Sequence, residues 1–150
     1  MERFALVMTS LSPFLSLPSR FAGMGPVILR AGLGAVFLAH AYAKAFVFTL
    51  PGTAHFFEAN GFPGVLAYPV FAAELLGGVA LIAGFRTRAV SALLFAIMLG
   101  ALRPHLANGW MFTNTGGGWE YVAFLLATLA AQIFLGPGAM PDRYSKAGRG

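Results

Sequence analysis

The stretch PVILRAGLGAVFLAHAYAKAFVF, residues 26–48, decides the fold. Nearly all of it is apolar, it opens with a proline, which suits the first turn of a helix, and the pair Pro51-Gly52 follows as a helix stop. At a rise of about 1.5 Å per residue, a helix of this length reaches roughly 34 Å, and the hydrocarbon core of a bilayer is about 30 Å thick. The sequence therefore predicts a membrane-spanning helix here.

Three further apolar segments predict spans over about residues 64–85, 89–106 and 119–135. Only the polar turn 86–88 separates two of them, and so short a turn forces neighbouring helices to run antiparallel. The segment 53–60, TAHFFEAN, is too short to span and predicts a brief helix at the membrane surface. We therefore expect an all-α, membrane-embedded antiparallel four-helix bundle, with a short interfacial helix between its first two helices.

The composition excludes an ordinary soluble domain. Apolar residues make up 58% of the chain and charged residues 10%, whereas soluble proteins carry about 25% charged residues. Cysteine is absent, which excludes disulfides, thiolate metal sites and cysteine nucleophiles. The length suits one domain. We expect an N-terminal cytoplasmic or interfacial arm over 1–23, a transmembrane domain over 24–138 and a basic cytoplasmic tail over 139–150.

Basic residues lie on one side of the expected bundle. Loops 49–63 and 107–118 contain no Lys or Arg. The arm, the turn after the second span and the tail contain Arg3, Arg20, Arg86, Arg88, Arg143, Lys146 and Arg149. The positive-inside rule places these segments, and so both termini, in the cytoplasm. The net charge of +5 suits a bilayer with anionic headgroups, and we expect no nucleic-acid partner.

Three ionisable residues lie in the first span, where each costs about 2.5–3.5 kcal/mol at mid-helix. Arg30, His40 and Lys44 fall within a sector of roughly 80° and so share one helix face. Beside this face runs a ridge of alanines at a spacing of four: Ala31, Ala35, Ala39 and Ala43. We expect the ridge to permit close helix packing and the polar face to point inward. For Arg30 and Lys44 the alternative is snorkelling to the headgroups.

Glu74 lies in the middle of the second span, near the bilayer midplane. Its carboxyl group must be protonated there, or paired with a cation such as Lys44 or Arg103. It is either a structural ion pair or a carboxylate that handles protons or orients a ligand. Gly77 and Gly78 follow within one turn, and their small size would let a helix or a ligand approach.

Polar and aromatic residues gather at the outer ends of the spans, where we expect a pocket open to the outer side. Its candidate residues are Glu74, His40 and Lys44 as catalytic groups, and Arg103, His105, Trp110 and Glu120 as ligand-binding groups. The alternative for Trp110 and Trp119 is the aromatic belt at the membrane surface. His55 and Glu58 would either cap the pocket or remain solvated.

The three histidines, His40, His55 and His105, are the candidate metal ligands. They lack the tight spacing of a metal motif, so their signal is weak. We expect no metal site and no intrinsic cofactor, with haem ligation by two histidines as the remaining alternative.

Four motifs in order resemble the DoxX family of small four-helix membrane proteins. They are LRAGLGAVFLAHAYAK (29–44), FFEANGFPG (56–64), AELLGGVALIAGFRTR (73–88) and GGGWEYVAFLL with a later GPG and Asp (116–142). Lys44, Glu74, Arg88 and Glu120 occupy the motif positions. The chain departs from the pattern at His40 and Ala41, where many members have a glycine-containing stretch.

The resemblance implies a multi-pass protein of the inner membrane with a redox role. One branch of the family is similar to a subunit of thiosulfate:quinone oxidoreductase, and other members belong to membrane oxidoreductase complexes in oxidative-stress responses. The sequence itself shows no flavin or nucleotide motif, so electrons would have to come from a partner. Partners would be other redox subunits or further copies of the chain.

Three functions remain open. The first is a membrane subunit of a quinone-linked oxidoreductase system, in which His40, Lys44 or Arg103 would donate to a quinone and Glu74 or Glu120 would exchange protons. The second is a non-catalytic anchor or assembly subunit of a redox complex, whose buried charges are structural ion pairs. The third is a small transporter for a lipid or weak acid, for which four helices without an internal repeat are poorly suited.

Overall fold

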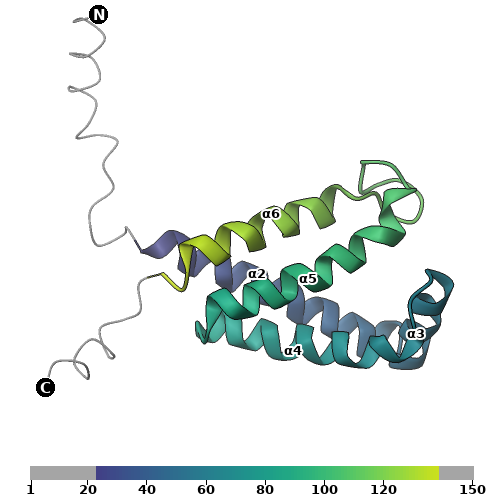
Figure 1. Cartoon of the computed structure of the whole chain (residues 1–150), viewed down its shortest axis with the longest axis horizontal. Helices are drawn as coiled ribbons and strands as arrows, with labels where there is room; N and C mark the ends of the chain where they lie inside the picture. The colour runs from purple at the N-terminus through teal and green to yellow at the C-terminus, as the bar shows by residue number, and fades with distance from the viewer. Residues whose placement is uncertain (1–22, 139–150) are drawn as a thin grey trace, which may run out of the picture.

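The computed structural model describes residues 23–138 (Figure 1). Within this range the chain is all-α and has no strand. Its α-helices are α2 (Met24–Tyr42), α3 (Leu50–Ala59), α4 (Ala67–Ala83), α5 (Thr87–Leu106) and α6 (Glu120–Leu135), with a π-turn at Ala43–Val47 and a 3-10 turn at Gly64–Leu66. The expected arm, apart from Gly23, and the expected tail 139–150 lie outside the described residues.

Three helical stretches are long and apolar enough to cross a membrane: Met24–Val47, Gly64–Ala83 and Thr87–Leu106. Helix α6 is apolar but shorter, at 16 residues. Large apolar side chains cover the outside of the helices, and those of Phe46 and Phe134 are 74% and 83% exposed. Because lipid solvates such side chains and water does not, the chain is a membrane protein.

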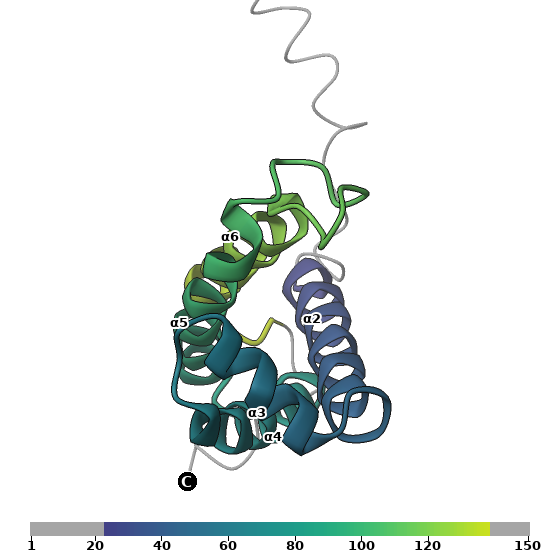
Figure 2. The ribbon, with the colours of Figure 1, turned by 90° about the vertical axis from the view of Figure 1, so that its right-hand side faces the viewer.

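The helices associate in two close pairs, α2 with α4 and α5 with α6. The pairs meet mainly through α4 with α5, and less through α2 with α6. Figure 1 shows α2 and α6 close together near the described ends of the chain and apart toward α3. Seen from the α3 end in Figure 2, α2 stands away from α5 and α6.

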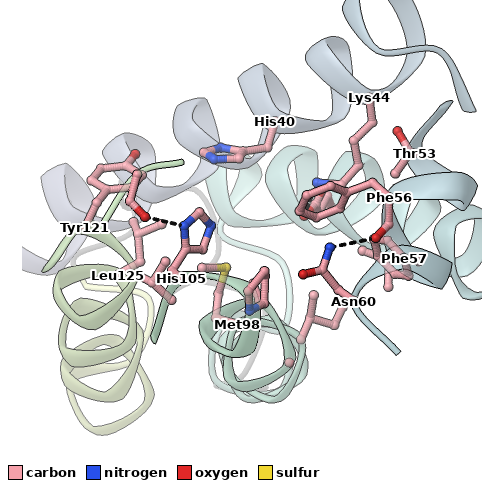
Figure 3. Close-up of a pocket in the computed structure, with 18 of the residues that line it drawn as sticks. His40, Lys44, Thr53, Phe56, Phe57, Asn60, Met98, His105, Tyr121 and Leu125 are labelled. Atoms are coloured by element: carbon pink, nitrogen blue, oxygen red, sulfur yellow. Dashed lines mark hydrogen bonds and ion pairs between the residues drawn. The ribbon is translucent and has the colours of Figure 1, made fainter. Parts of the chain in front are cut away.

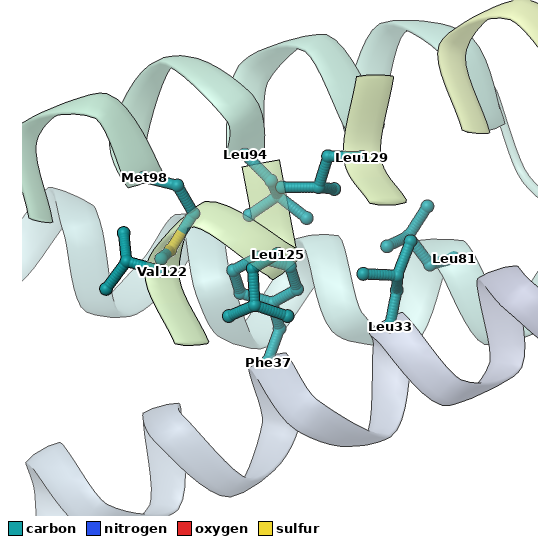
Figure 4. Packing of buried hydrophobic residues seen from close by; sticks show 8 residues of the cluster. All are labelled: Leu33, Phe37, Leu81, Leu94, Met98, Val122, Leu125 and Leu129. Carbon is teal, nitrogen blue, oxygen red and sulfur yellow. The ribbon is translucent and has the colours of Figure 1, made fainter. Parts of the chain in front are cut away.

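The apolar core lies between the two pairs (Figure 4). Every long helix contributes to it, and its buried members are Leu33, Phe37, Leu81, Leu94, Met98, Val122, Leu125 and Leu129. In a bilayer the lipid is as apolar as this core, so the pairs are held by van der Waals packing rather than by removal of apolar surface from water.

Two glycines bring α2 and α4 into close contact. A Cβ added to Gly34 would lie 2.7 Å from the carbonyl oxygen of Gly78, and one added to Gly78 would lie 2.9 Å from the carbonyl oxygen of Gly34. The expectation that the alanine ridge makes this contact is wrong, because Ala31, Ala35 and Ala39 are exposed in the chain. Only residues without a Cβ fit at this separation.

Arg30 joins the helices at the end of the molecule opposite α3, which we call the closed end (Figure 1). Its side chain is buried, and the guanidinium donates to the carbonyl oxygens of Leu81 at 2.8 Å, Pro137 at 3.0 Å and Ile82. Carbonyls in the last turn of a helix lack the regular intrahelical partner and carry the negative end of the helix dipole, so a buried cation suits them. The Leu81 oxygen also accepts from Gly84 N–H at 3.1 Å. Arg30 therefore joins α2, the end of α4 and the chain after α6, and it neither snorkels nor lies beside Lys44.

Candidate functional site

A cavity of about 1270 Å³ occupies the end of the molecule where the two helix pairs diverge. Side chains from all five α-helices and from the loop after α5 line it (Figure 3). Most of the lining is apolar, and six phenylalanines contribute: Phe48, Phe56, Phe57, Phe62, Phe112 and Phe124. An apolar cavity with a few polar groups is the usual form of a small-molecule site.

The charged part of the lining is an ion pair between Lys44 and Glu74. Lys44 Nζ donates to Glu74 Oε1 at 2.8 Å and to Oε2 at 2.7 Å, and the Glu74 side chain is 5% exposed. Such a bidentate contact satisfies a carboxylate that would otherwise be too costly at this depth. Of the two cations proposed as partners from the sequence, Lys44 therefore pairs with Glu74.

Lys44 reaches Glu74 from an irregular turn. Residues Ala43–Val47 form a π-turn, in which Phe48 N–H donates to the carbonyl oxygen of Ala43 at 2.9 Å. A π-turn contains more residues per turn than an α-helix, so it changes the direction of the side chains that follow α2. Such turns are frequent at functional sites, and nothing in the hydropathy of this segment indicates one.

Two histidines line the cavity with similar backbone contacts. His40 Nδ1 lies 2.8 Å from the carbonyl oxygen of Val36, and His105 Nδ1 lies 2.9 Å from that of Gly117. The ring of His40 also stacks on the ring of Tyr121, with centroids 6.2 Å apart and planes 13° from parallel. Figure 3 shows His40 on the α2 side of the cavity, facing His105 and Tyr121.

The loop 107–118 folds back over α6 and closes one wall of the cavity. Its backbone is held by Asn108, whose amide donates to the carbonyl oxygens of Gly116 and Gly117, and by Glu120, which accepts from Phe112 N–H at 2.8 Å. Trp110 lies edge-on to Trp119, with ring centroids 4.3 Å apart. Trp110 and Glu120 line the cavity, as the sequence predicts.

Arg103 is the predicted site residue that does not line the cavity. Its side chain is exposed, and the guanidinium carbon lies 5.3 Å from the centre of the Phe62 ring, a cation–π contact on the outside of the helices. His55 and Glu58 also lie outside the cavity and face each other at 3.4 Å, with side chains 83% and 60% exposed. Of the two expectations for this pair, the structure therefore agrees with exposure to solvent and not with capping of the pocket.

Several lining residues were not predicted from the sequence. They are the phenylalanines named above, and Thr53 and Asn60. The sequence signal that could have indicated them is the density of aromatic residues in FFEANGFPG. This signal is weak, because apolar helices without a binding site are also rich in aromatic residues. Among residues 23–138, no three His, Asp or Glu side chains are close enough to share a metal ion.

The helices and the cavity define a small helical membrane protein with room for an apolar molecule. The DoxX family model matches residues 25–114, and the chain belongs to the DoxX family. A protein of Bacillus subtilis (strain 168), named "Putative oxidoreductase CatD", is 35% identical over 79 residues, which are 53% of this chain and 58% of that protein. The match thus spans little more than half of that relative. No solved structure matches the chain significantly.

Proposed function

We propose that the chain is a membrane subunit of a quinone-linked oxidoreductase system and binds a quinone, or a similar apolar ring compound, in the cavity. The observation that carries this proposal is the cavity itself, about 1270 Å³ of mainly aromatic and aliphatic surface with a buried ion pair and two histidines. Pockets for drug-sized ligands have volumes of about 300–1,000 Å³, so this cavity has room for a ring with an apolar substituent.

We further propose that α2, α4, α5 and α6 form a transmembrane four-helix bundle in the inner membrane, with α3 at its surface. The loop 107–118 at the cavity end contains no Lys or Arg, whereas Arg86 and Arg88 lie at the other end. The positive-inside rule then places the closed end in the cytoplasm and the cavity toward the outer side. At 16 residues, α6 is near the minimum length and needs its flanking residues to complete the span.

The chemistry of the lining suits binding and proton exchange better than electron transfer by the chain alone. Lys44 and Glu74 form a neutral unit that fixes a dipole at the inner wall of the cavity. The histidines and Glu120 lie where protons would pass between a bound ring and the outer side. A redox partner would supply or remove the electrons, and the relative's name supports an oxidoreductase system.

Two glycines on the spanning helices provide a matched test of the cavity. Gly100 lines the cavity, and Gly32 does not, yet a Cβ added to either would have no atom within 4 Å. We expect Gly100→Leu to lower the affinity for a decyl-substituted benzoquinone about tenfold or more, because the side chain fills the cavity, while Gly32→Leu leaves affinity unchanged. Binding is measured on the purified full chain in detergent. Equal affinities of both variants and the unsubstituted protein would refute the site.

The second candidate is a non-catalytic anchor or assembly subunit, and one observation favours it. Among residues 23–138, the one ion pair shielded from solvent, Lys44–Glu74, is complete within the chain. The buried Arg30 donates only to backbone carbonyl oxygens. Under this hypothesis Glu74→Gln lowers the yield of folded protein but leaves the specific activity of a co-purified redox partner intact. A fall in that activity per mole of folded complex would favour the quinone-binding function.

A further inference from the structure

We infer that the cavity takes its ring ligand in the hydroxyl-bearing form, a hydroquinone or an alkylated phenol, in preference to the quinone. This inference rests on the proposed function and specifies which redox form the same site recognises. It follows from the direction of the hydrogen bonds that His40 and His105 already make.

The tautomer of each histidine is set by its backbone partner. A carbonyl oxygen only accepts, so the ring nitrogen that faces it must carry the hydrogen. This nitrogen is Nδ1 in both rings, at 2.8 Å from the Val36 oxygen for His40 and at 2.9 Å from the Gly117 oxygen for His105. In a neutral imidazole the other nitrogen, Nε2, then has a lone pair and no hydrogen.

Both rings are expected in the neutral form. Among the described residues, neither His40 nor His105 forms an ion pair with a carboxylate. An imidazolium without a counter-ion is costly against the apolar lining of this cavity. Each histidine therefore presents a hydrogen-bond acceptor to the ligand, and the donor role that the sequence suggested for His40 is not available to its neutral ring.

Lys44, another donor expected from the sequence, keeps one N–H for a ligand. Two of its three N–H groups point to the two oxygens of Glu74. The amide of Asn60 donates one N–H to the carbonyl oxygen of Phe56 at 2.8 Å and keeps one N–H donor and its oxygen acceptor. The remaining N–H groups of Lys44 and Asn60 can donate to a quinone carbonyl or to a hydroquinone hydroxyl alike, so they do not discriminate between the two forms. The hydroxyl of Tyr121 can donate or accept and so does not discriminate.

A quinone and a hydroquinone differ in what they can offer to these acceptors. A quinone carbonyl only accepts, so it would bury the Nε2 lone pairs without a partner, which costs more than a hydrogen bond gains. A hydroquinone hydroxyl can donate to Nε2 and can still accept from Trp110 or Tyr121, which line the same cavity. We expect the hydroquinone to bind roughly tenfold more tightly or better, a ratio equal to about 1.4 kcal/mol.

The test compares ligands of similar shape whose ring oxygen either carries a hydrogen or does not. Affinities of the purified full chain in detergent are measured under anaerobic conditions for decyl-substituted benzoquinone and its hydroquinone. A second pair, 4-decylphenol and 4-decylanisole, gives the same comparison without redox chemistry, because the methyl ether only accepts. Both hydroxyl compounds should bind more tightly than their partners.

Three substitutions assign the preference to the histidines. Glutamine offers an N–H donor as well as an acceptor. His40→Gln and His105→Gln should therefore each bring the ratio of the two affinities, hydroxyl compound over its partner compound, closer to one. His55→Gln is the matched control, because His55 is exposed and lies outside the cavity. It should leave both affinities and their ratio unchanged.

The outcomes separate this inference from the proposed function. Quinone affinity equal to or higher than hydroquinone affinity overturns the inference and leaves the proposed quinone site standing. No binding of any of the four compounds overturns the proposed function and the inference with it. A preference that neither cavity variant changes overturns the assignment to the histidines. If a variant does not fold, the phenol and anisole affinities of the unsubstituted chain still decide the preference.

Discussion

Lys44 and Glu74 form a bidentate ion pair between the π-turn after α2 and helix α4, with Nζ 2.8 and 2.7 Å from the two carboxylate oxygens. The side chains are 17% and 5% exposed, so neither charge is well solvated. An ion pair in such surroundings contributes little net stability compared with apolar side chains, but either charge alone is costly. The pair should therefore behave as one unit when it is mutated.

We predict that Glu74→Gln destabilises the protein by about 3–5 kcal/mol, because it leaves the Lys44 ammonium unpaired. Adding Lys44→Met to Glu74→Gln should recover most of this loss. The measurement is thermal or denaturant unfolding of each variant in the same detergent. Glu58→Gln, which removes an exposed carboxylate, should stay within about 0.5 kcal/mol of the unsubstituted protein. Additive losses in the double variant would show that the two charges do not depend on each other.

Much of the helical layout could be predicted from hydropathy. The apolar segments 26–48 and 89–106 correspond closely to Met24–Val47 and Thr87–Leu106, because long runs of apolar residues between turn signals have few other solutions. The short segment 53–60 is likewise helical except for its last residue, and α3 begins three residues earlier than predicted, at Leu50. A short turn joins antiparallel helices α4 and α5 as predicted, but it lies at residues 84–86 rather than 86–88 (Figure 1). The interfacial place of α3 and the four-span topology stay predictions.

Features that depend on contacts between helices were beyond sequence reasoning. The spacing of the alanines predicted that they make the close helix contact, but Gly34 and Gly78 make it. The distance between the two helix backbones determines which small residues fit, and the sequence does not give that distance. The helical periodicity of the sequence places Arg30 on one face with His40 and Lys44. In the structure its guanidinium instead donates to the Leu81 carbonyl oxygen near the end of α4. For the site, the structure places Arg103 and Trp119 outside the cavity and places along it Glu74, His40, Lys44, His105, Trp110 and Glu120. The directions of their hydrogen bonds depend on the folded geometry and could not be predicted from the sequence.

The glycine contact gives a second prediction. Gly34→Ala should destabilise the protein by about 1–3 kcal/mol, because its Cβ would lie 2.7 Å from the Gly78 oxygen and force α2 and α4 apart. Gly32→Ala, two residues away on the same helix, meets no atom within 4 Å and should be neutral. Melting temperatures of the two variants in detergent make the comparison. Equal losses would mean that glycine acts through helix flexibility rather than through contact.

Arg30 gives a third prediction. Arg30→Met should lower the melting temperature by several degrees, because the partly buried Pro137 oxygen loses its donor, at a cost of about 1–3 kcal/mol, and the Leu81 oxygen keeps only Gly84 N–H. The matched control is Arg103→Met, which removes an exposed guanidinium whose ring contact contributes about 0.5–1 kcal/mol. A larger loss for Arg103→Met than for Arg30→Met would contradict the role of Arg30 at the closed end.

Ser91 gives a prediction of opposite sign. It is fully buried in α5, and its hydroxyl has no hydrogen-bond partner among the described residues. Ser91→Ala should therefore be neutral or stabilise the protein by up to about 1 kcal/mol, because an unsatisfied buried hydroxyl carries a desolvation cost. Thr128→Val is the natural comparison on the neighbouring helix α6, where the single hydroxyl hydrogen is shared between the carbonyl oxygens of Phe124 at 2.9 Å and Leu125 at 3.0 Å. This isosteric change should destabilise by about 0.5–1.5 kcal/mol. Loss of stability in Ser91→Ala would instead indicate that an internal water satisfies the serine in the membrane.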